Sequence, residues 1–169
     1  MSERRIGFIP GAVALRQDME PCGVFVTDQR MILVFEGPTI KGVKAGLKAS
    51  FGAGADMLPE PRPQTDYAMV DIESLAKKND NISVPHISIE KLAIGKGIGG
   101  YGIWCAYTGE NMKKQYLVVT FVPPPDLVKK RKAEGLSTRE VRREYAMKCQ
   151  EVFKRALPPI IAEKVDWKI

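Results

Sequence analysis

The 169-residue sequence predicts a mainly β domain, α+β by content, in which strands come first and helices come last. Short apolar runs separated by turn residues occur within about residues 12–35 and 82–122, whereas the last quarter carries a long amphipathic pattern with the period of a helix. A chain of this length buries a sufficient core without disulfides or metals. We therefore expect a single domain over residues 1–169, with a barrel core at about 12–123 that a C-terminal helix caps.

A hairpin is the clearest local element of the sequence. Its strands are Cys22–Val26 and Met31–Phe35, and Thr27-Asp28-Gln29-Arg30 connects them. The flanking Val, Phe, Ile and Leu suit a pleated, buried surface, and we expect Asp28 to accept hydrogen bonds from its own turn. A shorter strand at Ala12–Arg16 precedes the hairpin.

A Gly- and Lys-rich insertion at about residues 37–63 interrupts the sheet and ends in a Pro-rich connector. Within it Lys41, Lys44 and Lys48 share one side of a marginal helix, opposite an apolar side. A second short helix is expected from Tyr67 to Lys78, capped by Thr65-Asp66.

Sheet resumes after this helix. An alternating stretch from Ile82 to Ile94 contains Pro85, which requires an edge, a bulge or a strand break. Ile103–Tyr107 and Tyr116–Val122 follow as a second hairpin around the Thr108–Asn111 turn. We expect one barrel core to contain the apolar strand residues Val24, Val26, Ile32, Val34, Ile89, Ile103, Val119 and Phe121.

Helices occupy the C-terminal part, at about residues 126–157. Asp126 is expected to cap a short basic helix that Gly135 ends, and Ser137 with Glu140 predicts a capping box for a longer helix to about Leu157. The inward stripe of that helix is Val141, Tyr145, Cys149, Val152 and Ala156, assisted by Phe153 and Leu157. The apolar tail, residues 158–169, is expected to dock on this domain or on a neighbour, which leaves a homo-oligomer open.

Several segments in this order are similar to a known family. They are the strand end Val26-Thr27-Asp28-Gln29-Arg30, the Gly-rich excursion, the strand entry Pro85-His86-Ile87-Ser88-Ile89-Glu90-Lys91-Leu92, and the C-terminal helix. Together they resemble the prokaryotic pleckstrin-homology-like (bacterial PH or GRAM-like) domains. The resemblance implies a PH-like, seven-stranded, partly open barrel of two near-orthogonal antiparallel sheets, and a role as a binding scaffold.

One loop departs from that family pattern. Phosphoinositide-binding relatives place Lys and Arg between the first two strands, whereas this loop holds Asp18 and Glu20 with only Arg16 at its edge. The composition of the loop argues against capture of inositol phosphate there.

The remaining motifs favour structural roles over chemistry. Gly95, Gly97 and Gly100 satisfy G-x-G-x-x-G, but a strand follows instead of a helix, which favours a hairpin loop over a dinucleotide site. His86 is the sole histidine, so a packed or hydrogen-bonded role is favoured over catalysis. Cys22, Cys105 and Cys149 lack metal-ligand spacing and are expected to be reduced, buried thiols of a cytoplasmic protein. No catalytic residue, cofactor site or metal site is predicted.

Positive charge concentrates at the C-terminal end. The chain carries a net charge of +6, and residues 126–169 hold 12 Lys and Arg against 7 Asp and Glu. The candidate contact residues are Lys41, Lys44, Lys48, Lys129, Lys130, Arg131 and Lys132. They favour a non-enzymatic module that contacts a protein partner or an anionic membrane surface peripherally, without a transmembrane segment. Nucleic-acid binding by the basic helices is one alternative, and a small-molecule-binding or enzymatic barrel is a second.

Overall fold

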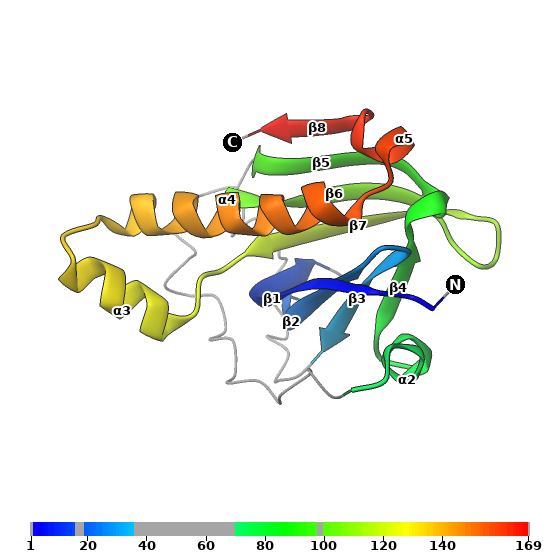
Figure 1. Ribbon diagram of the computed structural model, residues 1–169, viewed down its shortest axis with the longest axis horizontal. Coiled ribbons are helices and arrows are strands. Elements are labelled where there is room, and N and C mark those ends of the chain that lie inside the picture. The colour runs from blue at the N-terminus through cyan, green and yellow to red at the C-terminus, as the bar shows by residue number, and fades with distance from the viewer. Residues whose placement is uncertain (1, 16–18, 36–69, 98–99, 169) are drawn as a thin grey trace.

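The strands form one continuous hydrogen-bonded sheet, and the long C-terminal helix lies along it (Figure 1). The computed structural model describes residues 2–15, 19–35, 70–97 and 100–168. Within them eight strands have the order β4-β3-β2-β1-β7-β6-β5-β8, and the sheet is not closed. The strands are β1 (Arg5–Leu15), β2 (Met19–Thr27), β3 (Arg30–Phe35), β4 (Ile82–Pro85), β5 (Ile89–Gly97), β6 (Gly100–Thr108), β7 (Lys114–Phe121) and β8 (Val165–Lys168).

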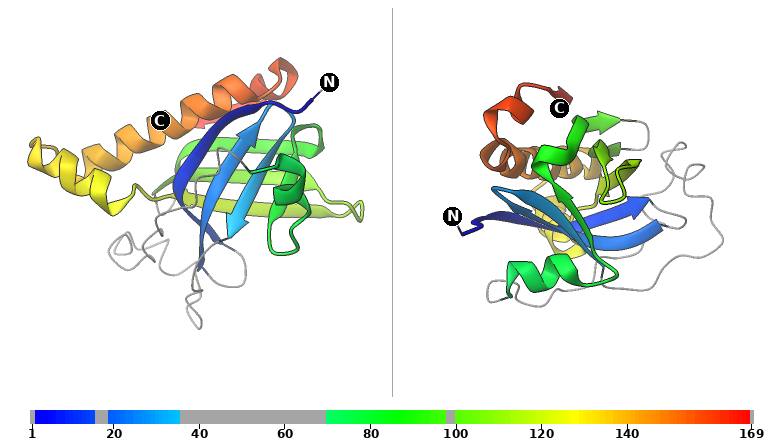
Figure 2. Two further views of the ribbon diagram at one scale, coloured as in Figure 1. Left: turned by 60° about the horizontal axis from the view of Figure 1, so that its bottom comes forward. Right: turned by 90° about the vertical axis from the view of Figure 1, so that its right-hand side faces the viewer.

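Strand β1 joins the two halves of this sheet. The β1–β4 half lies across the β5–β8 half at a steep angle (Figure 2), and β1 pairs with both β2 and β7. Its register with β2 shifts between Ile9 and Ala12, which bends the strand. A Cβ on Gly11 would lie 1.9 Å from the Val122 carbonyl oxygen, so this close approach requires glycine. The expected strand at Ala12–Arg16 therefore begins earlier, because the bulge accommodates Pro10 and Gly11.

Helix α4 (Thr138–Ala156) contacts strands from both halves of the sheet. Its expected inward residues Val141, Tyr145 and Cys149 are buried, and Phe153 is fully enclosed. These side chains share one core with strand residues such as Val24 and Ile103. The prediction that the C-terminal helix covers the core of the sheet is confirmed.

Two of the eight expected barrel-core residues lie on the opposite face of the sheet. Ile32 and Val34 pack with Phe25 and Leu75 in a second cluster beneath α2 (Ile72–Lys77), whereas the other six join the main core. Their neighbours Met31 and Leu33 point into the main core instead. Since β3 is apolar on both faces, its sequence does not reveal which alternate set faces which core.

The short helices begin at different caps from those expected. Asp71, placed inside the predicted 67–78 helix, is the N-cap of α2, and its side chain accepts a hydrogen bond from the Ser74 amide at 2.9 Å. Helix α3 (Pro125–Ala133) has Pro124 at its N-cap, and Asp126 lies in the first turn. The Ser137–Glu140 capping box is confirmed by reciprocal hydrogen bonds, with Glu140 Oε2 accepting from the Ser137 amide at 2.8 Å.

The apolar tail docks on the chain's own sheet. Helix α5 (Pro159–Ala162) turns the chain, and β8 then pairs in parallel with β5. Val165 is buried, and Trp167 packs against the main core beneath the Lys154 ammonium, which lies 5.7 Å from its ring centroid. The expected seven antiparallel strands thus become an eight-stranded mixed sheet, and of the apolar tail Ile161 and Val165 are buried whereas Ile160 is 67% exposed.

Pro85 ends β4 as a strand break, and a 3-10 helix, His86–Ser88, leads into β5. The predicted second hairpin is confirmed by the antiparallel pairing of β6 with β7. No helix in the described ranges has both the length and the apolar character needed to cross a membrane.

Candidate functional site

The predicted basic run on α3 is exposed except at Arg131. Lys129, Lys130 and Lys132 are exposed, and none forms an ion pair with another described residue. No residue of α3 is fully buried, and half-buried Leu127 packs against the main core. The second predicted set, Lys41, Lys44 and Lys48, lies outside the described residues, as does the whole 37–63 insertion.

Arg131 holds α3 against α4 and is not free to bind a ligand. Its Nη2 donates to Glu144 Oε2 at 2.7 Å and to Oε1 at 2.9 Å, and its Nε also donates to Oε2 at 3.1 Å. The same guanidinium pairs with Glu134. These hydrogen bonds raise the pKa of Arg131. Because the fork of donors fixes the helix pair, the three lysines of α3 are presented on a defined frame.

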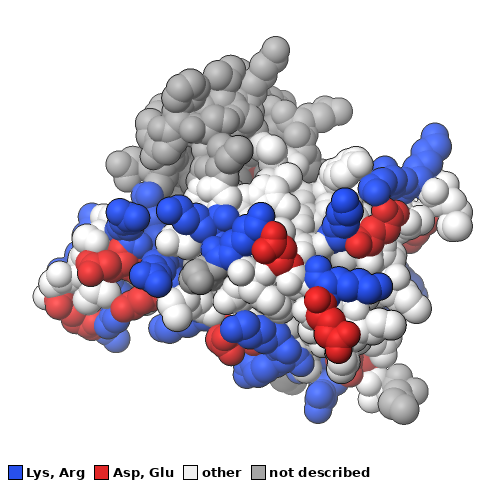
Figure 3. All heavy atoms as spheres, turned by 90° about the horizontal axis from the view of Figure 1, so that it is seen from above, with Lys and Arg blue, Asp and Glu red and all other residues white. Residues whose placement is uncertain are grey.

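Figure 3 looks down on α4 and β8 and shows Lys and Arg side chains crowded toward the α3 end of this face. A hollow of about 500 Å³ lies between α3 and α4, and its lining includes Lys130, Lys148, Leu127 and Met147. Glu134 and Glu144 also line it and neutralise Arg131. This hollow is therefore of mixed charge.

A second cleft, of about 310 Å³, is lined mainly by cations and was not predicted. We call it the cationic cleft, and its lining residues are Lys96, Tyr101, Arg139, Glu140, Arg143 and Lys168. Figure 1 shows why a corner exists here: the first turns of α4 extend past the place where β5 and β8 end side by side. Gly95 permits this ending, since it has a φ of +141° and a Cβ there would lie 2.6 Å from the Lys168 carbonyl carbon.

Most of the cations in the cationic cleft have no ion-pair partner among the described residues. The side chains of Lys96, Arg139 and Arg143 form no ion pair with another described residue, whereas Lys168 Nζ lies 2.9 Å from Asp166 Oδ2. Glu140 is already hydrogen-bonded by Ser137, whose hydroxyl and amide lower the pKa of that carboxyl. The arrangement can attract anions, because a cleft lined by one sign of charge concentrates counter-ions.

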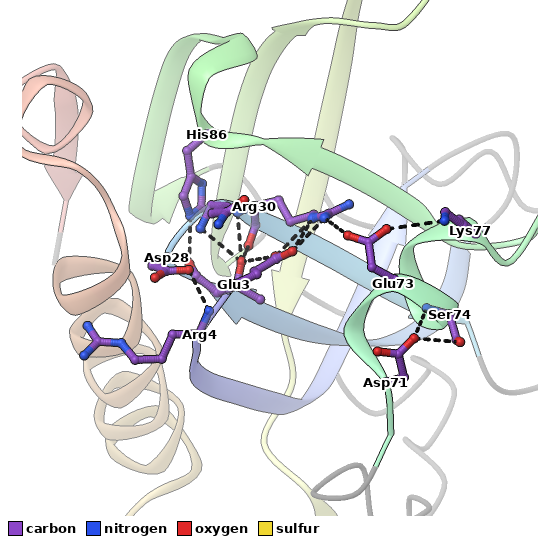
Figure 4. A network of polar contacts seen from close by, with 11 residues as sticks. Glu3, Arg4, Asp28, Arg30, Asp71, Glu73, Ser74, Lys77 and His86 are labelled. Carbon is purple, nitrogen blue, oxygen red and sulfur yellow. Dashed lines mark hydrogen bonds and ion pairs between the residues drawn. The ribbon is translucent and has the colours of Figure 1, made fainter. Parts of the chain in front are cut away.

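A separate polar network ties the N-terminus to the β2–β3 turn (Figure 4). Glu3 accepts from Thr27 Oγ1 at 2.5 Å and from Arg30 Nη2 at 2.6 Å, and Arg30 also reaches Glu73 Oε1 at 2.5 Å. Thr27 Oγ1 accepts from the Gln29 and Arg30 amides. Thr27 therefore holds the turn, and the expected role of Asp28 is corrected: its Oδ1 accepts from the Arg4 amide instead, at 2.9 Å.

His86 is packed under this turn, as predicted for a structural histidine. It is 2% exposed, and its Nε2 lies 2.9 Å from the Thr27 carbonyl oxygen. Since a carbonyl only accepts, Nε2 carries the proton and Nδ1 is the unprotonated nitrogen. Nδ1 has no partner in the described structure, and burial lowers the pKa of the ring.

The three thiols are free and buried, and burial raises the pKa of each to about 12. They are consequently protonated and unreactive at neutral pH. The G-x-G-x-x-G glycines lie in the β5–β6 hairpin, as predicted. Across the described ranges, no cluster of three or more His, Cys, Asp or Glu could hold a metal ion.

Compared with protein-family models, with curated proteins and with solved structures, the chain matches none. The geometry alone therefore guides the assignment. Sequence reasoning missed the cationic cleft, although Arg139 and Arg143 are four residues apart and so share one face of the predicted helix. Lys96 and Lys168 carried no such signal, because only the β5–β8 pairing brings them together.

Proposed function

We propose that this chain is a non-enzymatic, PH-like binding module of the cytoplasm that attaches peripherally to an anionic membrane surface through α3. The PH-like part of the proposal is supported by the strand order β4-β3-β2-β1-β7-β6-β5, by the bend of β1 and by the packing of α4 on both halves. The non-enzymatic part is supported by the burial of the three thiols and the one imidazole.

The observation that carries the membrane contact is the lysine group of α3, which has no ion pair among the described residues and which the Arg131–Glu144 fork holds in place. Each basic residue near an anionic leaflet contributes about 1 kcal/mol. Because Leu127 of α3 packs against the protein's own core and the exposed side of the helix is lysine-rich, we expect the attraction to be electrostatic and to fall steeply with salt.

Vesicle sedimentation tests the proposal with the full chain. The first variant is Lys129→Glu, Lys130→Glu, Lys132→Glu, and vesicles of phosphatidylcholine alone or with phosphatidylglycerol are compared at low and high salt. The control is Lys78→Glu, Lys91→Glu, Lys113→Glu, which changes the net charge equally at exposed lysines elsewhere.

We expect the α3 variant, and not the control, to lose binding to the anionic vesicles. Equal loss in both variants would show a response to net charge only and would refute an α3 site. If duplex DNA displaces the protein from vesicles and binds more tightly at the same salt, the nucleic-acid alternative replaces the membrane proposal.

A further inference from the structure

The cationic cleft is a separate site, about which the proposed membrane contact says nothing. Its walls come from the ends of β5, β6 and β8 and from the first two turns of α4. We propose that the cleft binds the phosphate group of a small phosphomonoester. The inference rests on charge, size and rigidity, and it does not depend on the α3 lysines.

The charge of the cleft matches one phosphate dianion. Lys96, Arg139 and Arg143 lack ion pairs within the described structure, whereas the Lys168 charge is shared with Asp166. Among the described residues, these three cations and the Glu140 carboxylate give a net charge of about +2, and a phosphomonoester carries about −1.5 to −2 at pH 7. The two guanidinium groups also supply the forked donors that phosphate oxygens accept.

The cleft is larger than a phosphate alone. Its volume of about 310 Å³ is at the lower end of the range for small-molecule pockets, about 300 to 1,000 Å³. Tyr101 packs against the main core and lies opposite Lys96 in the β5–β6 register. Residues directly opposite on neighbouring strands lie side by side, so a ligand held by Lys96 can place an organic group on the Tyr101 ring.

The walls of the cleft are fixed in place before any ligand arrives. The capping box sets the start of α4, and Gln150 Nε2 donates to the Ile94 carbonyl oxygen at 3.3 Å, which fastens α4 to β5. Lys154 over Trp167 fastens α4 to β8. The backbone that carries the exposed side chains of Lys96, Arg139 and Arg143 is thus held in place, so a ligand has to order only these side chains.

Calorimetric titration of the full chain at low salt tests the proposal, with inorganic phosphate, phenyl phosphate and phenyl sulfate as probes. We expect saturable binding in the order phenyl phosphate, phosphate, phenyl sulfate, because the sulfate carries one charge. Arg139→Gln with Arg143→Gln should weaken phenyl phosphate binding at least about tenfold. The control pair, Arg142→Gln with Lys148→Gln, removes the same charge from α4 outside the cleft and should leave binding within about twofold.

Two further variants separate the parts of the site. Tyr101→Ser should remove the advantage of phenyl phosphate over phosphate, and Lys96→Gln should weaken both probes. Thermal melts check that each variant is folded. If replacing both arginines perturbs α4, Lys96→Gln still tests the site, because Lys96 lies at an exposed strand end.

Vesicles distinguish the source of the phosphate. Phosphatidic acid presents a phosphomonoester, whereas phosphatidylglycerol presents a diester. If the variant Arg139→Gln with Arg143→Gln loses binding only to phosphatidic acid, the ligand is a lipid headgroup. If the same variant loses binding to soluble phenyl phosphate, the ligand is a free phosphomonoester. Absence of saturable binding of every phosphate probe in the millimolar range, or an equal loss in the control pair, would overturn the site. Either result leaves the α3 proposal standing.

Discussion

The hydroxyl of Tyr145 is the polar link between α4 and the bend of β1. It accepts a hydrogen bond from the Gly11 amide at 2.8 Å and donates to the Gly11 carbonyl oxygen at 3.2 Å. The carbonyl has a second partner, the Val122 amide at 3.0 Å. Gly11 falls in the register shift of β1, where neither β2 nor β7 pairs with it. Tyr145→Phe therefore keeps the ring in the core and leaves the buried Gly11 N–H without its partner.

The cost follows from that unsatisfied donor. A buried backbone group that loses its only partner costs about 1–3 kcal/mol, while the carbonyl remains satisfied. For a chain of this size each kcal/mol lowers the melting temperature by about 2–4 °C. We expect Tyr145→Phe to lower it by about 2–12 °C and to accelerate hydrogen exchange of the Gly11 amide.

A second tyrosine supplies the matched control. Tyr107 donates to Gln115 Oε1 at 2.7 Å, and Gln115 is half-buried, so water can replace the lost hydroxyl. Tyr107→Phe should cost less than about 1 kcal/mol. Urea denaturation of both variants measures the difference. A Tyr145→Phe protein as stable as Tyr107→Phe, with an unchanged Gly11 exchange rate, would refute the reasoning.

Three other predictions concern single groups. Burial lowers the pKa of His86, so the unfolded chain binds the proton first and the free energy of unfolding should fall as pH drops below about 6.5. Between pH 7.5 and 5.5 the urea midpoint of wild type should fall by more than that of His86→Gln. Equal changes in the two midpoints would contradict this prediction. Because burial raises the pKa of Cys22, Cys105 and Cys149 to about 12, a thiol reagent should label them only on unfolding, and rapid labelling of the native protein would count against their burial. Ser137→Ala should cost about 1 kcal/mol through the capping box, measured by urea denaturation, and an unchanged midpoint would show that the box contributes nothing to stability.

The sequence alone determined those features whose causes lie within a few residues. The first hairpin follows from apolar runs around a short turn, the strand break follows from Pro85, and the start of α4 follows from Ser137 and Glu140, which bond to each other. The amphipathic stripe of α4 also predicted correctly that the helix covers the core of the sheet. Local hydrogen bonding and hydrophobic period are visible in a short window of sequence.

Tertiary structure decided whatever depends on residues far apart in the chain. The face on which Ile32 and Val34 lie is fixed by the docking of α2, because β3 has no alternation to read. Asp28 does not hold the hairpin turn, because its Oδ1 accepts instead from the amide of Arg4, which lies 24 residues away in the sequence. The cationic cleft likewise exists only because β8 pairs with β5 beside the start of α4, and no local pattern encodes a parallel pairing across some seventy residues.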